Sequence, residues 1–561
     1  MKKKKAVKKI FYADTETTQF DPVKGVRVYL WCAIDDNGNE YFNFDVDTLY
    51  KFLATHDAIF YFHNLKFDWS YVEYYALTHG IKYKILERKG TIFSVKFGAC
   101  ELRDSINLIN CSLQDMGNNY CTQYKKTSID YEAADYDHKA TAAEIEYCLN
   151  DCYVLREGLT TWKNNLKEIL LRNGAIKTVA KIDKKLTYAG IAFEAFKELS
   201  LFDECCPKTT LEEYNQLIGA YHGGYVYSNP GGIQRNIMMI DCNSIYPYIY
   251  SEKALPYGNG FLCDNEEEIY KHDFYIINVN ISFDLKPGFI PIIGGGFGKY
   301  GGINYQRSTD GQTINITVCR YDWELIKEFY YVEYEYCSGY WWNTQQGFYK
   351  RYCDIFMAEK INAKSLIVRS LAKMMLNSPY GKTAMNGTSE IVDYFLQDDV
   401  VHSKIVGYEV QDEVFQYLPQ AISITAQARQ HLLHTAKSIG FDKVAYMDTD
   451  SIKFDMIGVD TSKLWIHPKQ LGAWKDEGHP FYFKTIAPKK YIIYEGGKLS
   501  ITCAGFNKKA LTQQLYHGQQ VSTQKARLLI TKFDKGLKIE CLQSKKVKGG
   551  RALLKVWKEI I

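Results

Sequence analysis

The placement of acidic residues constrains the fold of this chain more than any other feature of its sequence. Carboxylates stand at the ends of short apolar runs that have the length and pattern of β-strands. In residues 11–16, Phe-Tyr-Ala-Asp-Thr-Glu, the acids Asp14 and Glu16 are two apart. Side chains two apart on a strand project from one face, where carboxylates repel each other unless a cation lies between them. The pattern predicts an α/β fold that presents acids on a sheet.

Two further segments complete this N-terminal set. The apolar run 58–62 is followed by a His-Asn pair and then by Asp68. Tyr147 and Asp151 are four apart in a helical stretch, so they stack on one helix face. Four acids and a phenol in this order suit phosphodiester hydrolysis with two metal ions, in which Tyr147 would orient the attacking water. Each fragment alone is more often a surface acid or an ordinary helix tyrosine.

A second set of acids lies in the C-terminal half. Asp241 ends an apolar run, and a short turn then leads to Tyr246. Residues 443–456 predict strand, tight turn and strand, with Asp448 and Asp450 at the tip. These hard oxygen ligands suit Mg²⁺. For the Asp-Thr-Asp-Ser segment alone, an ordinary polar turn would be the favoured interpretation.

A cationic stripe lies between the two halves of this second set. Arg369, Lys373 and Asn377 are spaced by four and share one helix face, with Tyr380 nearby. The positive charges of such a stripe can bind a triphosphate while the phenol packs against a base. The alternative is a solvated basic face, which the apolar residues on the opposite face disfavour. Pro379 is expected to end or kink the helix.

Length and pattern predict several soluble domains. The chain has 561 residues, 46% of them hydrophobic, without a run of eighteen apolar residues that could span a membrane and without a secretion signal after the basic start. Strands are predicted at 10–13, 26–34, 58–62 and 92–95, and helices near 358–375 and 424–438. The 15 cysteines lack the paired spacing of a zinc site and are interpreted as free thiols.

The C-terminal segment is strongly basic. Residues 508–561 contain 13 Lys and Arg against 3 Asp and Glu, although the whole chain carries only +4. Apolar residues are interleaved with these charges, which predicts a folded basic module suited to a polyanion. Residues 296–301 match Gly-x-Gly-x-x-Gly, but loop and strand rather than helix are predicted after them, so no dinucleotide-binding fold is expected.

In this order, the motifs resemble those of family B DNA polymerases, specifically the protein-primed branch encoded by small bacteriophages with linear genomes. The resemblance covers nearly the whole chain. It departs at Pro379, where a bulky apolar residue is more usual. Beside the three N-terminal segments it rests on Tyr221-x-Gly223-Gly224, Asp241 to Tyr246-Pro, Lys373 to Tyr380-Gly, Tyr446 to Asp450-Ser, Lys489-x-Tyr491 and Cys503-Ala-Gly505.

The resemblance implies an α/β multidomain fold. An RNase H-like (DnaQ-type) 3′→5′ exonuclease domain would precede a right-hand polymerase domain with palm, fingers, thumb and two protein-priming insertions. The expected boundaries are 1–170 for the exonuclease, 171–251 for a connecting region and the start of the palm, 252–350 for the first insertion and palm strands, 351–385 for the fingers, 386–416 for the second insertion, 417–506 for the palm and 507–561 for a basic thumb.

The resemblance also implies roles for single residues. Asp241 and Asp450 would hold the polymerase metals beside Asp448. The implied exonuclease residues are the metal ligands Asp14, Glu16, Asp68 and Asp151, the catalytic Lys126 and the water-orienting Tyr147. The implied nucleotide-binding residues are Tyr246, which would exclude a 2′-hydroxyl, Lys360, Lys373, Asn377 and Tyr380. The implied DNA-binding residues are Thr17, His63, Asn64, Phe67, Ser105, Tyr221, Gly223, Gly224, Lys489 and Tyr491.

The implied function is DNA-dependent DNA synthesis on a linear viral genome, started from a protein primer, with strand displacement and proofreading. Two Mg²⁺ ions, or Mn²⁺, are expected in each active site. The expected partners are template and primer DNA, dNTPs and a terminal priming protein, for a monomer in the cytoplasm of the bacterial host. Two alternatives are a nuclease with a DNA-binding C-terminal module, which the second set of acids disfavours, and a family B polymerase that extends ordinary primers.

Overall fold

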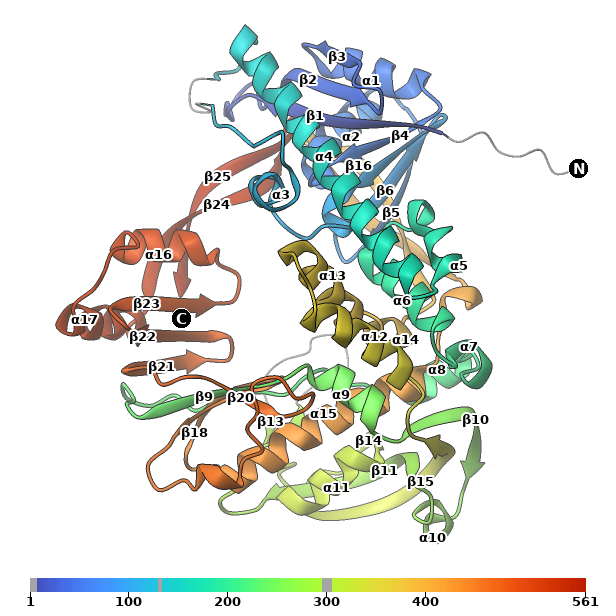
Figure 1. Ribbon diagram of the computed structural model, residues 1–561, viewed down its shortest axis with the longest axis vertical. Helices are drawn as coiled ribbons and strands as arrows, with labels where there is room; N and C mark the ends of the chain where they lie inside the picture. The colour runs from blue at the N-terminus through green and yellow to red at the C-terminus, as the bar shows by residue number, and fades with distance from the viewer. Residues whose placement is uncertain (1–7, 130–133, 295–304, 561) are drawn as a thin grey trace, which may run out of the picture.

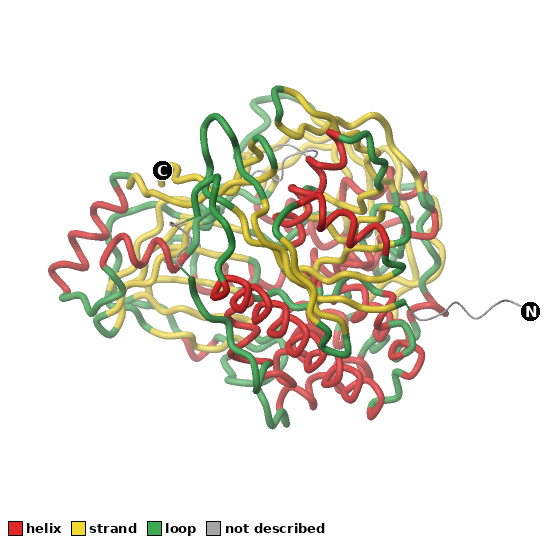
Figure 2. The backbone as a smooth tube through the Cα atoms, turned by 90° about the horizontal axis from the view of Figure 1, so that it is seen from above, coloured by secondary structure: helices red, strands yellow, loops and turns green. Residues whose placement is uncertain are grey.

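The computed structural model describes residues 8–129, 134–294 and 305–560. In Figure 1 an N-terminal sheet lies at the top, and the red C-terminal segment reaches up to it. Figure 2 shows helices and strands mixed along the chain, as expected for an α/β protein. The Gly-x-Gly-x-x-Gly match at 296–301 lies outside the described residues. Among the described helices, none is long and apolar enough to cross a membrane.

Seven strands form the N-terminal sheet, in the order β3-β2-β1-β4-β7-β6-β5. The side chains of β1 alternate between two cores, because Phe11 packs with helices α1 and α2 whereas Tyr12 packs with α4. Asp14 therefore points to the side of α4. The elements are β1 Lys9–Thr17, β2 Val28–Asp35, β3 Glu40–Asn43, α1 Val46–Thr55, β4 Ala58–Phe62, α2 Leu65–Thr78, β5 Lys84–Arg88, β6 Thr91–Phe97, β7 Cys100–Asp104, α3 Leu113–Tyr120 and α4 Ala142–Arg172. The four predicted strands are confirmed within β1, β2, β4 and β6.

A five-stranded sheet carries the second set of acids, in the order β20-β9-β19-β18-β8. The predicted strand, turn and strand at 443–456 are confirmed as β18 and β19. Helix α15 packs against α9 and β19, and it begins at Leu418, before the predicted 424, because Pro419 fits its first turn. The elements are β8 Val226–Ser228, β9 Ile237–Cys242, α9 Ile245–Glu252, α15 Leu418–Ile439, β18 Val444–Asp448, β19 Ser451–Asp455 and β20 Trp474–Gly478.

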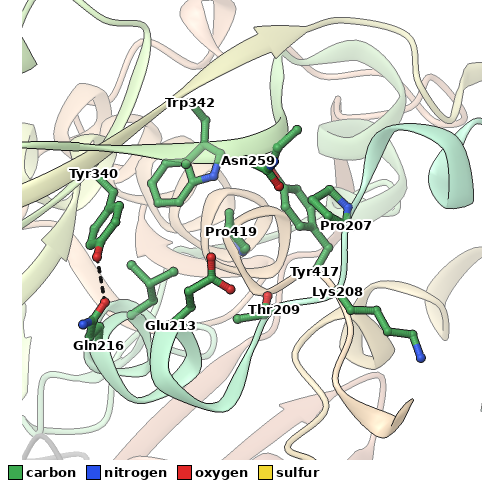
Figure 3. A pocket seen from close by; sticks show the side chains of 13 residues that line it. Pro207, Lys208, Thr209, Glu213, Gln216, Asn259, Tyr340, Trp342, Tyr417 and Pro419 are labelled. Atoms are coloured by element: carbon green, nitrogen blue, oxygen red, sulfur yellow. Dashed lines mark hydrogen bonds between the residues drawn. The ribbon is translucent and has the colours of Figure 1, made fainter. Parts of the chain in front are cut away.

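A four-stranded sheet follows helix α9 along the chain, in the order β10-β15-β11-β14. It rests on the connecting helices, and Figure 3 shows the pocket at this junction, where the Tyr340 hydroxyl donates to Gln216 Oε1 at 2.8 Å. The elements are α5 Ile176–Val179, α6 Tyr188–Glu198, α7 Phe202–Cys205, α8 Leu211–Leu217, β10 Leu255–Cys263, β11 Phe274–Leu285, β14 Ile314–Cys319, α11 Arg320–Phe329 and β15 Tyr330–Gln345.

The prediction of a single helix near 358–375 is wrong. Two helices, α12 (Lys350–Ile361) and α13 (Leu366–Asn377), occupy this region, separated by a short turn. The break follows from Ser365, whose side chain accepts a hydrogen bond from the backbone N–H of Val368 and so caps a new helix. Helix α13 ends at Asn377, and Pro379 starts the short helix α14 (Tyr380–Thr383), as predicted.

The basic C-terminal segment folds and returns to the N-terminal sheet. The tip of its last hairpin buries Val547 and Ala552 in the core beneath β1, and the Lys548 carbonyl accepts from the Val26 N–H at 3.0 Å. Lys548 also pairs with Asp399, in the turn of the β16–β17 hairpin, at 2.9 Å. The elements are β16 Thr388–Gln397, β17 Val400–Val410, β21 Tyr482–Ala487, β22 Lys490–Glu495, β23 Lys498–Cys503, α16 Lys508–Tyr516, α17 Thr523–Asp534, β24 Leu537–Val547 and β25 Gly550–Ile560.

Candidate active sites

Four acids predicted from the N-terminal motifs meet at one end of β1. Asp14 and Glu16 lie on β1, Asp68 on α2 and Asp151 on α4. The Thr15 hydroxyl donates to Asp68 Oδ1 at 2.7 Å, which ties α2 to the strand. Asp68 and Asp151 are almost fully buried.

Burial and mutual repulsion disfavour ionisation of these acids. Burial, followed by the charges of Asp151, Asp68 and Glu16, raises the pKa of Asp14 well above its ordinary value. Burial first, and then Asp151, raises the pKa of Glu16 to about 8, and burial raises the pKa of Asp68 to about 7. Clustered carboxylates with raised pKa values are the environment that a divalent cation relieves, so the donor set fits metal ions.

Lys126 and Tyr147 adjoin this cluster. The Lys126 ammonium donates to the Tyr147 hydroxyl at 2.7 Å and forms an ion pair with Asp151 Oδ2. The other oxygen, Asp151 Oδ1, is buried and has no hydrogen-bond partner among the described residues. A buried carboxylate oxygen left open toward an acid cluster again fits a cation ligand.

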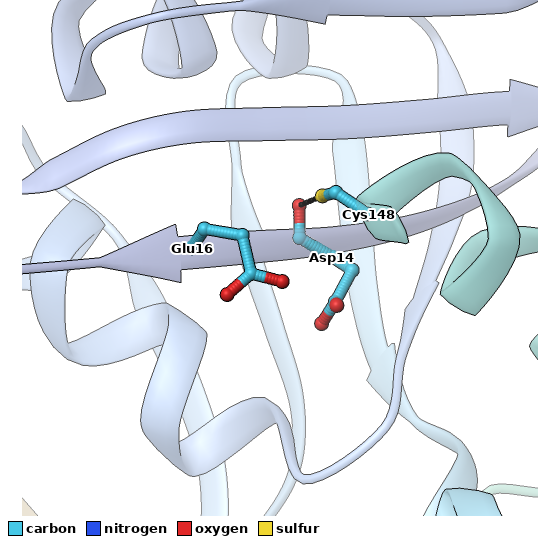
Figure 4. A group of neighbouring side chains, drawn as sticks. All are labelled: Asp14, Glu16 and Cys148. Atoms are coloured by element: carbon cyan, nitrogen blue, oxygen red, sulfur yellow. Dashed lines mark hydrogen bonds between the residues drawn. The ribbon is translucent and has the colours of Figure 1, made fainter. Parts of the chain in front are cut away.

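Cys148 lies close to the same acids but is not suited to hold a cation with them. Its sulfur and one oxygen each of Asp14 and Glu16 lie within 4.8 Å of one another. Figure 4 shows, however, that the Cys148 sulfur is directed at the Asp14 carbonyl oxygen, away from both carboxylates. It donates there at 3.7 Å, and burial raises the pKa of the thiol well above its ordinary value. A neutral thiol is a poor ligand for a hard cation.

The structure places Ser105 in the protein interior, and its contact with a nucleic acid stays a prediction. Ser105 is fully buried, and its hydroxyl donates to the Phe62 carbonyl at 2.8 Å and bonds His63 Nδ1 at 2.9 Å. His63 Nε2 bonds the Cys111 carbonyl at 2.9 Å, so this ring has no free nitrogen for a phosphate. Sequence reasoning missed Asp104, a buried carboxylate at the end of β7 that accepts from the Asn64 backbone N–H at 3.0 Å and fixes its left-handed conformation.

Thr17 and Phe67 remain at the edge of the acid cluster. Thr17 is the last residue of β1, and Phe67 lies on α2, packed partly against the core and edge-on to Tyr71. Both are partly exposed. Their contact with a nucleic acid stays a prediction.

The second set of acids also converges. Asp241 on β9 pairs with Ser451 on β19, the residue after Asp450, and the Cys242 N–H donates to the Asp450 carbonyl at 2.7 Å. Burial, and then the charge of Asp450, raises the pKa of Asp241 to about 7. Burial, and then Asp448, raises the pKa of Asp450. These two acids therefore form a second oxygen cluster that fits a divalent cation.

Asp448 is held differently from its two neighbours. The Lys489 ammonium donates to both of its oxygens, at 2.9 and 2.8 Å, and the Tyr446 hydroxyl donates to Oδ2 at 3.2 Å. Lys489 has a left-handed backbone conformation. Tyr491, two residues after it, packs against Tyr446. The predicted Lys-x-Tyr element thus lies against the Asp-Thr-Asp turn.

Three cationic side chains lie near these acids: Lys360 on α12, and Arg369 and Lys373 on α13. Burial, and then the charges of Lys373 and Arg369, lowers the pKa of Lys360, so these three cations lie close together. Lys360 Nζ donates to Ser244 Oγ at 3.3 Å, beside the turn that follows Asp241. The charge of Lys373 in turn offsets part of the rise in the pKa of Asp450. Asn377 lies one turn further along α13, at its last residue, and is partly exposed.

The two predicted nucleotide-binding tyrosines stack on each other. The ring centroids of Tyr246 and Tyr380 are 4.0 Å apart, with an angle of 23° between the planes. Tyr246 lies on α9, directly after the turn that follows Asp241, and Tyr380 begins α14.

The Tyr221–Gly224 segment lies against the Asp-Thr-Asp turn. A methyl group on Gly224 would lie 2.3 Å from Thr449 Oγ1, whereas one on Gly223 would meet nothing within 4 Å. Sequence reasoning missed the residue that holds this segment. Arg429 on α15 donates to the carbonyls of His222 and Gly223 at 2.5 and 2.8 Å, and a buried ion pair with Asp322 on α11 fixes its guanidinium at 2.5 Å. Tyr221 is partly buried beside them.

Comparison with known proteins agrees with this arrangement. The family model "DNA polymerase type B, organellar and viral" matches residues 49–144 and 135–457. The DNA polymerase of Bacillus phage B103 is 27% identical over 519 residues, covering 86% of this chain and 87% of that protein. That of Bacillus phage phi29 is 26% identical over 552 residues, covering 90% and 92%.

A solved structure shows the same fold. The phi29 DNA polymerase complexed with primer-template DNA and incoming nucleotide substrates superposes with a TM-score of 0.84 at 24% identity, covering 99% of this chain and 100% of that one. The chain belongs to the organellar and viral family of type B DNA polymerases. Its fold is an RNase H-like exonuclease domain followed by a right-hand polymerase domain, its activity is that of a DNA polymerase, and its family implies divalent metal cofactors.

Proposed function

We propose that this polymerase replicates a linear viral genome from a protein primer, displaces the strand ahead of it and edits with its own 3′→5′ exonuclease. One observation carries the proposal of two activities: two separate acid clusters, one on β1 and one on β9 and β19, have pKa values raised by burial and mutual repulsion. A DNA-binding module without catalysis gains nothing from buried acids that face a polyanion.

For synthesis, Asp241 and Asp450 would hold two divalent cations, Mg²⁺ or Mn²⁺, whose charge would favour ionisation of the primer hydroxyl and offset that of the triphosphate. Lys360, Arg369 and Lys373 bind the phosphates and align them with the primer end. The Tyr246 ring lies under the sugar and excludes a 2′-hydroxyl by volume, and its stacked neighbour Tyr380 packs against the new base pair. Asn377 adds a polar contact to the nucleotide, and Lys489 and Tyr491 steady the primer end.

For editing, Asp14, Glu16, Asp68 and Asp151 would hold a second pair of divalent cations, whose charge would stabilise the negative charge at the cleaved phosphate. Lys126 holds the Tyr147 hydroxyl by a hydrogen bond, so the phenol can orient the attacking water. Asn64, Thr17 and Phe67 grip the frayed strand, and His63 offers its ring face. Ser105 holds the His63 ring and so contributes to the same grip.

Protein priming and strand displacement rest on the two inserted elements. The four-stranded sheet at 252–350 offers a surface for a terminal protein. The β16–β17 hairpin meets the C-terminal hairpin through the Lys548–Asp399 ion pair, so the two can enclose DNA and support displacement. Tyr221, Gly223 and Gly224 hold the template strand between the two sites. The working form is a monomer with DNA and dNTPs in the host cytoplasm.

Two variants test the separation of activities. Asp450→Asn should abolish dNTP incorporation while degradation of single-stranded DNA continues. Asp14→Asn combined with Asp68→Asn should do the reverse. If both activities fall together in a folded variant, the two-site model fails. Priming is tested by incubation with a labelled dNTP and a candidate terminal protein, where the absence of a covalent nucleotidyl-protein product would refute the priming proposal.

A further inference from the structure

A buried lysine lies beside the acids of the polymerase site. Lys453 is on β19, only 7% exposed, and pairs across the sheet with Met239 on β9 and Tyr446 on β18. Its Nζ lies 4.9 Å from the ring centroid of Tyr446 and 4.9 Å from that of Tyr491. Two aromatic faces therefore hold an ammonium that a lysine would otherwise extend into water.

The charge of Lys453 acts on all three acids. Asp448, Asp241 and Asp450 are the charges that stabilise its ammonium against burial. Burial raises the pKa of Asp241 and of Asp450, and the charge of Lys453 offsets part of that rise. The ion pair of Asp448 is made with Lys489 instead. Lys453 is therefore placed to balance the cluster as a whole without occupying the oxygens of any one acid.

We propose that Lys453 is a positioning residue that sets the affinity of the polymerase site for divalent cations. Without a cation, three carboxylates crowd one end of the sheet, and the ammonium offsets their repulsion. Once a cation is bound, the same ammonium repels it. Lys453 thus stabilises the empty site and weakens the loaded one. This inference rests on the proposed function, because it takes Asp241 and Asp450 as the cation ligands.

The test uses the full chain with Asp14→Asn and Asp68→Asn, so that binding at the editing site is suppressed. In this background Lys453→Met removes the charge but keeps an unbranched side chain, and Lys453→Arg keeps the charge. Lys475→Met is the matched control. Lys475 pairs with Asp241 in the sheet register, but its side chain is 44% exposed and bound to Glu477 at 2.5 Å.

Two measurements follow each variant: Mn²⁺ affinity from the electron paramagnetic resonance of free Mn²⁺, and the melting temperature in EDTA and in saturating Mn²⁺. Lys453→Met should bind Mn²⁺ at least about threefold more tightly, since a nearby positive charge has been removed from a partly dry site. Its melting temperature should fall in EDTA and recover in Mn²⁺. Lys453→Arg should match the background, and Lys475→Met should change affinity by less than about 1.5-fold because water screens it.

A role in packing alone predicts a different result. Lys453→Met would then melt at a lower temperature to the same extent in EDTA and in Mn²⁺, with unchanged affinity, and that outcome overturns the inference. Equal effects of Lys453→Met and Lys453→Arg would also overturn it, because shape rather than charge would matter. If Lys453→Met does not fold, Lys453→Gln gives the same comparison. If Asp450→Asn leaves Mn²⁺ binding of the background unchanged, the proposed metal site fails instead.

Discussion

The close approach of Gly224 to the Asp-Thr-Asp turn gives a sharp prediction. A methyl group at Gly224 would lie 2.3, 2.7 and 2.8 Å from three side-chain atoms of Thr449, the residue between Asp448 and Asp450. Ordinary contacts begin at 3.4 Å, so in Gly224→Ala the turn and the 221–224 segment must separate by about 1 Å. The Thr449 N–H also donates to the Tyr225 carbonyl at 2.8 Å, so the turn cannot move without straining this bond.

The displacement reaches Asp450, the proposed metal ligand next to Thr449. A misplacement of about 1 Å at a reacting centre costs roughly 100-fold in rate, and overpacking costs about 1–3 kcal/mol of stability. Gly224→Ala should therefore lower single-turnover dNTP incorporation at saturating DNA by about two orders of magnitude. Degradation of single-stranded DNA should stay unchanged, because the editing acids lie in another domain.

Two further variants make the reasoning refutable. Gly223→Ala introduces the same methyl group one residue earlier, where nothing lies within 4 Å, so any loss should appear as weaker DNA binding while incorporation at saturating DNA stays nearly full. Thr449→Gly removes the three atoms nearest to the new methyl group, and Thr449 has a left-handed backbone conformation that glycine adopts freely. Adding it to Gly224→Ala should restore most of the lost rate. Equal losses in the two glycine variants, or no recovery in the double variant, would refute the steric argument.

Three other perturbations follow from the described contacts. Lys126→Met should lower single-strand degradation by roughly 100-fold or more, since Tyr147 loses the cation that holds its hydroxyl, while primer extension stays unchanged. Arg429→Met should cost about 3–5 kcal/mol in denaturant unfolding, because it leaves the Asp322 carboxylate buried without its partner, and Asp322→Asn added to it should recover part of that loss. The raised pKa values of Glu16 and Asp68 mean that the folded, metal-free protein binds more protons than the unfolded chain, so its melting temperature in EDTA should fall as pH rises from about 5 to 8. Saturating Mg²⁺ should reverse that trend, and a melting temperature that rises with pH in EDTA would contradict it.

The sequence predicts which acids lie on the same face of a strand or helix, because this depends only on their local spacing. Asp14 and Glu16 share a strand face, and Tyr147 and Asp151 share a helix face, whatever the rest of the chain does. The hairpin that carries Asp450 is equally local. The fold class followed from the order of such segments. The single helix near 358–375 failed because Ser365 caps a new helix inside a continuous helical pattern, and a serine there has no distinct signal in apolar spacing.

What the sequence could not predict depends on distant contacts. Asp322 and Arg429 are separated by 107 positions, and only the fold places them together behind the Tyr221–Gly224 segment. Asp104 looks like any strand-end acid until β7 lies beside β4. The resemblance implies a DNA contact for Ser105, and the structure places this residue fully buried. For such residues the local pattern gives a residue type, and the tertiary packing decides its partner.

The two acid clusters each have a lysine, but the lysines act in different ways. In the editing site, the Lys126 ion pair occupies one oxygen of Asp151 and leaves the buried Oδ1 open, so a cation can bind without displacing the lysine. Lys126 therefore orients a ligand. In the polymerase site, two tyrosine rings hold Lys453 away from any single carboxylate oxygen. Lys453 therefore changes the charge of the whole cluster without orienting any one ligand. Loss of Lys126 should consequently disorder the geometry of one acid and its neighbouring phenol, whereas loss of Lys453 should change affinity while geometry persists.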